Sequence, residues 1–163
     1  MDLNNNEQYY CQVLNNLASL CSRSEKCEQD AIDYLTKKGL SQNECNRALN
    51  FLIENNYINN ERYVEAFVKD KQRFSKWGTK KIAMALLQKK ISKSLIENAI
   101  ADFAELNESD IIYEQVEKKA KSIKDNIYSK EARAKLLRFC ASRGYSIEKS
   151  FVAINRLLEK YNN

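Results

Sequence analysis

Apolar residues recur along this chain at helical spacing, and the same arrangement appears three times. Three ungapped stretches begin at Ser24, Ser75 and Ser129, and in each a second serine follows 17 residues later. Apolar residues stand seven, eight and eleven positions after that second serine, which places them on one face of a helix. The offsets between the stretches are 51 and 54 residues, so the pattern predicts a threefold internal repeat.

Each repeat is expected to contain three helices, which makes the predicted fold all-α. One helical pattern precedes each opening serine, and the three patterns cover residues 7–20, 60–74 and 108–128. Each opening serine is expected to cap a helix, because its hydroxyl can accept a hydrogen bond from a free backbone N–H group. Tandem three-helix repeats that share surface with their neighbours should form an elongated, curved array. The predicted repeats cover residues 1–56, 57–105 and 106–163, with joints expected at 55–60 and 104–110.

The residue before the second serine is apolar or aromatic in every repeat, which suits a contact back onto the preceding helix. One position earlier, Gly39 and Gly144 suit the left-handed conformation that ends many helices. Lys90 takes that place in the middle repeat, so we expect its turn to differ from the other two.

The composition agrees with a helical protein. Proline is absent and only three glycines occur in 163 residues, so few residues interrupt helices. The five cysteines are odd in number and form no CxxC pair, so we expect reduced, mostly buried thiols. The N-terminus resembles no signal peptide, and no run of about 20 apolar residues occurs. We therefore expect a cytoplasmic protein without a membrane partner.

An enzymatic function is not expected from this inventory. The chain has no histidine, the commonest general base and metal ligand. Gly39, Gly78 and Gly144 lie too far apart to form a phosphate-binding loop. The carboxylates are scattered along amphipathic helices, whereas two-metal chemistry needs them clustered. We expect no catalytic residue, no metal site and no cofactor.

Positive charge gathers in the middle and C-terminal parts of the chain. The formal net charge is +5, and residues 1–60 carry 5 basic and 8 acidic side chains. Residues 61–107 carry 10 basic and 6 acidic side chains, and residues 108–163 carry 12 and 8. This asymmetry favours a polyanion or an acidic protein as the partner.

The candidate binding face surrounds the chain's only tryptophan. Arg62, Lys69, Arg73 and Lys76 share one helical face if the helix reaches Lys76. Two lysines follow at the expected start of the next helix, where positive charge does not stabilise a helix, so an anionic partner explains them better. An ordinary solvated surface is the alternative. The predicted face comprises Arg62, Lys69, Lys71, Arg73, Lys76, Trp77, Lys80 and Lys81.

Two further features leave alternatives open. Trp77 can stack on a nucleic-acid base or a partner, or it can pack within the protein, as most tryptophans do. A secondary basic surface is expected from the third repeat, although its residues form no single stripe and an ordinary charged surface is the alternative. Its residues are Lys130, Arg133 and Arg138.

The segment YINNERYVEAFVKDKQRFSKWGTKKIAMALLQKKIS resembles the central signature of the RecX family of bacterial regulatory proteins. The resemblance covers about 35 residues, and the repeat extends it more loosely to nearly the whole chain. In this segment a basic helix follows the first matching residues, and lysine stands near the C-terminal end where the family usually has glycine. The matching residues are Asn60, Glu61, Arg62 and Tyr63 at the opening, Phe74, Trp77 and Gly78 in the middle, and Lys89, Lys90 and Ile91 at the close.

The resemblance implies a curved molecule of tandem three-helix repeats that modulates the RecA recombinase, usually as an inhibitor. It implies binding along the filament that RecA forms on single-stranded DNA, with lower ATPase and strand-exchange activity, in DNA repair, recombination and the SOS response. Single- or double-stranded DNA, bound without sequence preference, is the second implied partner. We expect a monomer.

Two other functions remain open from the residues alone. Three-helix units can place a helix in the major groove, so the chain could be an autonomous DNA-binding protein. It could also be a helical-repeat scaffold that binds only proteins, although the skewed charge argues against that. Tight, base-specific binding to duplex DNA would favour the autonomous DNA-binding protein. Absence of DNA affinity at low salt would favour the protein-binding scaffold.

Overall fold

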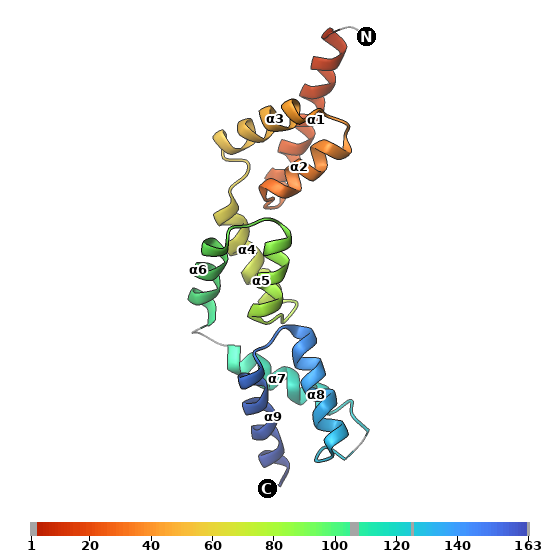
Figure 1. Ribbon diagram of the computed structural model, residues 1–163, viewed down its shortest axis with the longest axis vertical. Helices are drawn as coiled ribbons and strands as arrows, with labels where there is room; N and C mark the ends of the chain where they lie inside the picture. Colours follow the sequence, from red (N-terminus) through yellow and green to blue (C-terminus); the bar gives the residue numbers. More distant parts are fainter. Residues whose placement is uncertain (1–2, 105–107, 125, 163) are drawn as a thin grey trace. The chain divides into compact units, whose positions relative to one another are not determined.

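The computed structural model describes residues 3–104, 108–124 and 126–162, except the side chains of residues 3, 4 and 102–104. This part of the chain contains nine helices and no strand, which confirms the all-α prediction with three helices in each repeat (Figure 1). The helices are α1 (Leu3–Arg23), α2 (Glu28–Lys37), α3 (Gln42–Glu54), α4 (Asn60–Arg73), α5 (Thr79–Gln88), α6 (Lys93–Ala104), α7 (Glu108–Ala120), α8 (Lys130–Arg143) and α9 (Ile147–Asn162).

The backbone divides into two compact units. Unit 1 comprises Met1–Ala66 with Lys89–Ile91, and unit 2 comprises Phe67–Gln88 with Ser92–Asn163. The boundary therefore passes through α4 and not between two repeats. The predicted repeat boundary at 105/106 and residues 105–107 of the predicted joint at 104–110 lie outside the described residues. The predicted bounds and curved arrangement of the repeats stay predictions.

In each repeat the second of the two regularly spaced serines, 17 residues after the opening one, caps a helix. Ser41 accepts a hydrogen bond from the backbone N–H of Glu44, whose carboxylate accepts one from the N–H of Ser41 at 2.8 Å, a reciprocal capping box. Ser92 and Ser146 also accept from the backbone N–H three residues later. Of the opening serines, Ser129 alone is the N-cap of its helix.

The prediction of a cap at the other two opening serines is wrong. The helix after Ser24 begins only at Glu28, with Cys27 as its N-cap, and the helix after Ser75 begins at Thr79.

The first helix of the third repeat is shorter than its apolar pattern predicts. The pattern extends to residue 128, but α7 ends at Ala120. The Ser122 hydroxyl donates to the carbonyl of Lys119 at 2.7 Å, and the Asn126 side chain accepts from the backbone N–H of Tyr128 at 3.0 Å. These local side-chain bonds give the backbone an alternative to the helical ladder, which explains the early end.

Lys90 adopts the same left-handed conformation as the two glycines at its repeat position. Its φ is 56°, against 81° for Gly39 and 80° for Gly144. The expectation of a different turn at Lys90 is therefore wrong. The repeat imposes this backbone conformation on a residue with a Cβ atom, which is unfavourable for an L-amino acid.

Replacing Lys90 by glycine is expected to stabilise the protein by about 1 kcal/mol, because glycine adopts positive φ without the steric penalty. Urea unfolding of K90G measures the gain as a higher midpoint. Gln88→Gly, two residues earlier at the exposed end of α5, is the matched control and should lose about 1 kcal/mol. A loss of stability in K90G would contradict the assignment of strain to this residue.

Each unit contains an apolar core built from the predicted stripes. In unit 1 the core joins α1, α2 and α3 and includes Leu17, Leu35 and Leu52, each at most 2% exposed. In unit 2 the third repeat packs α7, α8 and α9 around Ile112 and Leu157. The side chain of Phe103, eleven positions after Ser92, lies outside the described residues.

The cysteines follow the expectation of reduced and mostly buried thiols. Four of the five are buried, Cys11 is exposed, and all five are free. Burial raises the pKa of the Cys21, Cys27 and Cys140 thiols above the ordinary value. Thiols in such surroundings are poor nucleophiles, so their burial fits a packing role.

The second helix of one repeat is capped by the first residue of the first helix of the next repeat, and this arrangement occurs twice. In unit 1 the Asn60 side chain accepts from the backbone N–H of Glu28 at 3.1 Å, at the start of α2. In unit 2 the Glu108 carboxylate accepts from the backbone N–H of Thr79 at 3.5 Å, at the start of α5. Glu28 and Thr79 occupy the same repeat position, 51 residues apart. The cap therefore belongs to the repeat itself.

Candidate functional site

The predicted binding face is interrupted where α4 ends. The helix stops at Arg73, and Lys76 has a φ of 53°, in the left-handed region. The backbone N–H of Trp77 then returns to the carbonyl of Lys71 at 3.0 Å. Because the helix does not reach Lys76, this lysine does not continue the face of Lys69 and Arg73, as the sequence pattern had required.

Residues of the third repeat hold this turn in place. Arg143 donates to the carbonyl of Ser75 at 2.8 Å, and the Tyr145 hydroxyl donates to the carbonyl of Lys76 at 2.6 Å. Burial raises the pKa of Tyr145 to about 12, so its phenol stays protonated as a donor at neutral pH. The turn is thus fixed by side chains that lie almost 70 residues further along the chain.

Trp77 packs within unit 2. Its ring meets the ring of Phe67 edge to face, with centroids 6.4 Å apart. The ammonium groups of Lys71 and Lys81 lie 5.2 and 4.6 Å from the centroid of the indole ring. Cation–π contacts of this length contribute about 0.5–1 kcal/mol at exposed sites. Of the two open interpretations of Trp77, internal packing describes its position.

Arg62 uses its donors inside unit 1. Its Nε atom donates to Glu25 at 2.9 Å, and its two terminal nitrogens donate to the side chain and carbonyl of Asn56 at 2.8 and 3.1 Å. A guanidinium held by a carboxylate and an amide has a structural role at this place. Arg62 lies in a different compact unit from the other residues of the predicted face.

Lys89 is likewise engaged within unit 1. Its ammonium group lies 2.5 Å from the Asp30 carboxylate, which also accepts from the backbone N–H of Cys27 at the start of α2. Burial alone would raise the pKa of Asp30, but these hydrogen bonds hold it below the ordinary value. The C-terminal end of the resembling segment is therefore bound to the first repeat through Lys89.

Three other basic residues of the predicted face lie around the end of α4. Lys69 is exposed, and Lys71 lies 3.6 Å from the neighbouring carboxylate of Asp70. The Arg73 guanidinium lies 5.4 Å from the centroid of the Phe74 ring, which is 72% exposed.

Two backbone segments of unit 2 meet without room for side chains. The N–H of Gly78 donates to the carbonyl of Arg143 at 2.7 Å, and the N–H of Lys80 donates to that of Gly144 at 3.2 Å. A Cβ atom on Gly78 would lie 2.3 Å from the carbonyl oxygen of Gly144. The start of α5 therefore meets the end of α8 directly, and its free N–H groups satisfy free carbonyls of α8.

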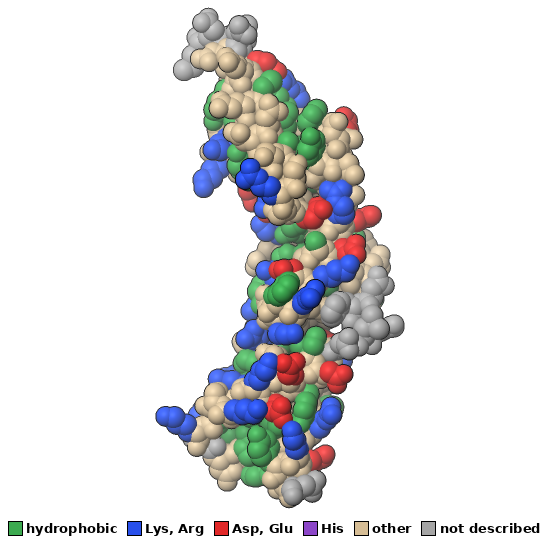
Figure 2. Space-filling model, turned by 180° about the vertical axis from the view of Figure 1, so that it is seen from behind, with side chains coloured by type: hydrophobic (Ala, Val, Ile, Leu, Met, Phe, Trp, Pro, Cys, Tyr) green, Lys and Arg blue, Asp and Glu red, His purple; other side chains and the backbone are tan. Residues whose placement is uncertain are grey.

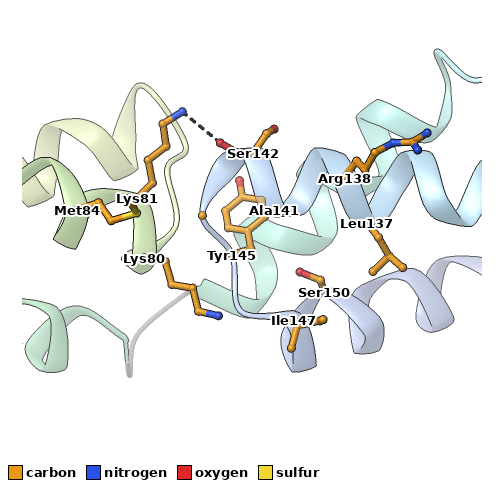
Figure 3. Close-up of a pocket in the computed structure, with 11 residues that line it drawn as sticks. Lys80, Lys81, Met84, Leu137, Arg138, Ala141, Ser142, Tyr145, Ile147 and Ser150 are labelled. Atoms are coloured by element: carbon orange, nitrogen blue, oxygen red, sulfur yellow. Dashed lines mark hydrogen bonds between the residues drawn. The ribbon is translucent and has the colours of Figure 1, made fainter.

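This meeting brings residues of both predicted basic surfaces to one groove (Figure 3). Lys80 and Lys81 come from the start of α5, and Arg138 comes from α8. The two lysines extend in different directions, and Lys81 donates to the carbonyl of Ser142 at 3.2 Å. The groove has a volume of about 640 Å³.

The floor of the groove is apolar, which sequence reasoning missed. Met84 of α5 is 64% exposed and Ile147 of α9 is 56% exposed, and both line the groove with Leu137 and the buried Tyr145. Their positions on their helices gave no sign of a shared surface, because the helices belong to different repeats. Among the described lining residues none is acidic.

The remaining secondary basic residues lie elsewhere on α8. Lys130 and Arg133 are exposed and line neither of the two hollows beside α8. Arg138 also borders the second hollow, whose other basic residues are Lys119, Lys124 and Lys135. On the face that Figure 2 shows, Lys and Arg side chains are numerous over the third repeat, with apolar side chains among them.

The described residues contain no group of three or more cysteines and carboxylates that could hold a metal ion. None of the described helices has the length and apolar content that crossing a membrane requires.

The fold and the groove define a helical-repeat protein with a basic groove, and comparison with known proteins identifies its family. A model of the second three-helix domain of RecX matches residues 59–100. The chain is 31% identical to the regulatory protein RecX of Clostridium tetani over 153 residues, which cover 93% of this chain and 70% of that protein. The protein belongs to the RecX family.

Two further comparisons agree with this assignment. The regulatory protein RecX of Clostridium perfringens strain 13 is 29% identical over 152 residues, covering 93% of this chain and 71% of that protein. The crystal structure of RecX from Lactobacillus salivarius superimposes with a TM-score of 0.79 at 20% identity, over 93% of this chain and 97% of that one. At that identity the structural match supports the fold alone.

Proposed function

We propose that this protein binds the filament of RecA on single-stranded DNA in the cytoplasm and inhibits the recombinase and its ATPase. Membership of the RecX family is the observation that carries the proposal. The role belongs to DNA repair and the SOS response, and the protein acts by binding, without a catalytic group of its own.

The charge distribution of unit 2 supports a partner of negative potential. Lys80 and Arg138 border a groove without acidic residues among its described lining, and Lys69 and Arg73 add positive charge at the end of α4. Surface cations of this kind accelerate association with acidic protein surfaces and DNA phosphates, and the attraction weakens as salt is added. Arg62 does not contribute, because its donors are used inside unit 1.

The ATPase activity of RecA on single-stranded DNA tests the proposal, with this protein titrated in at fixed salt. We expect inhibition at protein concentrations below that of RecA, because a filament can be blocked at its growing end. The variant Lys69→Ala/Arg73→Ala/Lys80→Ala should need about tenfold more protein for half inhibition, since it removes three surface cations.

The matched control is Arg23→Ala/Lys37→Ala/Lys38→Ala, which removes the same charge from exposed positions of unit 1. It should inhibit like the unmodified protein. No inhibition at equimolar protein would overturn the proposed function. Equal loss in both variants would show that net charge matters and the position of the cations does not.

A further inference from the structure

We propose that the groove between α5, α8 and α9 binds an acidic peptide segment that carries a bulky apolar side chain. The groove is lined by Lys80, Lys81, Met84, Leu137, Arg138 and Ile147, among others. This inference goes beyond the proposed function, because it concerns the chemistry of the ligand and holds for any partner that presents such a segment.

The apolar floor of the groove favours a ligand with an apolar group. Met84 and Ile147 expose 64% and 56% of their surface, and Leu137 lines the same groove. Exposed apolar side chains gathered in one depression, with polar residues at the rim, mark binding sites more often than surface accidents. A volume of about 640 Å³ accommodates one or two large side chains of a peptide.

The basic rim of the groove favours a ligand that carries negative charge. Among the described acidic residues, none lies within ion-pair distance of Lys80 or Arg138. Arg138 presents a planar guanidinium, which can hold a carboxylate through two parallel hydrogen bonds. Lys81 is held at Ser142 and over Trp77, so it contributes a fixed charge, whereas Lys80 extends from the start of α5 (Figure 3).

The combination favours a peptide over nucleic acid. Phosphates would satisfy the cations, but they would leave the exposed Met84 and Ile147 in contact with water. A peptide with carboxylates around a leucine or phenylalanine satisfies both the rim and the floor. Peptides that bind in grooves commonly combine apolar anchor residues with charged neighbours in this way.

Fluorescence anisotropy tests the proposal with a synthetic, fluorescein-labelled peptide of about twelve residues, rich in Glu and Asp, with a Leu and a Phe one helical turn apart. The peptide should bind the unmodified protein at moderate salt. The emission of Trp77 should change on binding, because this ring lies 4.6 Å from the Lys81 ammonium group at the rim.

Substitutions at the rim and the floor separate specific binding from general attraction. Arg138→Glu should weaken binding at least tenfold, whereas Arg133→Glu, an equal charge reversal on the same helix outside the groove, should change it less than threefold. Met84→Ser should weaken binding severalfold, whereas Val152→Ser, at another exposed apolar residue, should not. All four positions are exposed, so the variants should fold.

Three outcomes would overturn the proposal. The first is absence of peptide binding, or equal effects of R138E and R133E. The second is equal affinity for a peptide in which serine replaces the Leu and Phe, which would reduce the interaction to charge attraction. The third is a single-stranded oligonucleotide that binds with the same dependence on Arg138 while the peptide does not. None of these depends on RecA, so failure of the groove and failure of the proposed function are distinguishable.

Discussion

Replacing Gly78 by alanine is expected to lower the free energy of unfolding of unit 2 by about 4 kcal/mol. The new Cβ atom would lie 2.3 Å from the carbonyl oxygen and 2.5 Å from the carbonyl carbon of Gly144. Backbone atoms cannot move aside as the end of a flexible side chain can. The start of α5 and the end of α8 would therefore have to separate.

The expected loss has two parts. Overpacking at a tight contact costs about 1–3 kcal/mol. Separation also breaks the hydrogen bonds from Gly78 to Arg143 and from Lys80 to Gly144, at 2.7 and 3.2 Å, and each contributes about 1 kcal/mol. Unfolding of G78A in urea, followed by the fluorescence of the neighbouring Trp77, measures the sum.

Gly39→Ala is the control for this prediction. Gly39 has a φ of 81° but nothing within 4 Å of its missing Cβ atom. Alanine there should cost only about 1 kcal/mol, through backbone strain. If G78A and G39A lost the same stability, the close approach of α5 and α8 would not exist in solution.

Local features of the fold could be predicted from the sequence because local rules determine them. The spacing of apolar residues after Ser41 and Ser146 gave the buried faces of α3 and α9, although the caps formed by these second serines were not predicted. Gly144 gave the left-handed end of α8. Lys90 was misjudged because the pattern of residue types was taken to decide the turn. The packing of the repeat decides the conformation of the turn, and the backbone of Lys90 adopts positive φ despite the steric cost of its Cβ atom.

Interactions between distant residues could not be predicted, because a single sequence contains no sign of which residues meet. Gly78 stood out as a residue of the segment that resembles a family signature, yet its role is a backbone contact with a residue 66 positions further on. Glu108 occupies a helix start, where an acidic residue is ordinary. Its burial between Thr79 and Lys149 depends on how the second and third repeats pack.

The candidate site shows the same division between charge and position. Charge counting placed Lys80, Lys81 and Arg138 in basic regions, but it assigned them to two separate surfaces. The structure places all three around one groove because the start of α5 meets the end of α8. Arg62 was included by helical spacing alone, and its contacts to Glu25 and Asn56 were beyond reach of that argument.

Removing the carboxylate of Glu108 is expected to destabilise unit 2 by about 3 kcal/mol, because a half-exposed cation and a helix end both lose their partner. Glu108 is only 4% exposed, and its carboxylate lies 2.5 Å from the Lys149 ammonium group. The same carboxylate accepts from the backbone N–H and hydroxyl of Thr79 at 3.5 and 3.3 Å. In E108A the start of α5 would face a cavity that contains an unpaired positive charge.

A double-mutant cycle separates the two roles of Glu108. Lys149→Met removes the cation and keeps its aliphatic length, so E108A should cost less in the K149M background than in the unmodified protein. The cost that remains, about 1 kcal/mol, reports the cap on α5. Asp110→Ala is the control on the same first turn of α7, where the carboxylate is exposed, and it should cost less than about 0.5 kcal/mol.

A further substitution, compared with this cycle, tests whether the cap belongs to the repeat. Asn60→Ala removes the equivalent cap from the start of α2 in unit 1, where Asn60 and Glu28 are paired by hydrogen bonds of 3.1 and 3.0 Å. It should cost about 1 kcal/mol, the same as the portion of the Glu108 effect that survives in K149M. If N60A were neutral while E108A remained costly in K149M, the starts of α2 and α5 would be stabilised by different means. The first residues of α4 and α7 would then have no common role.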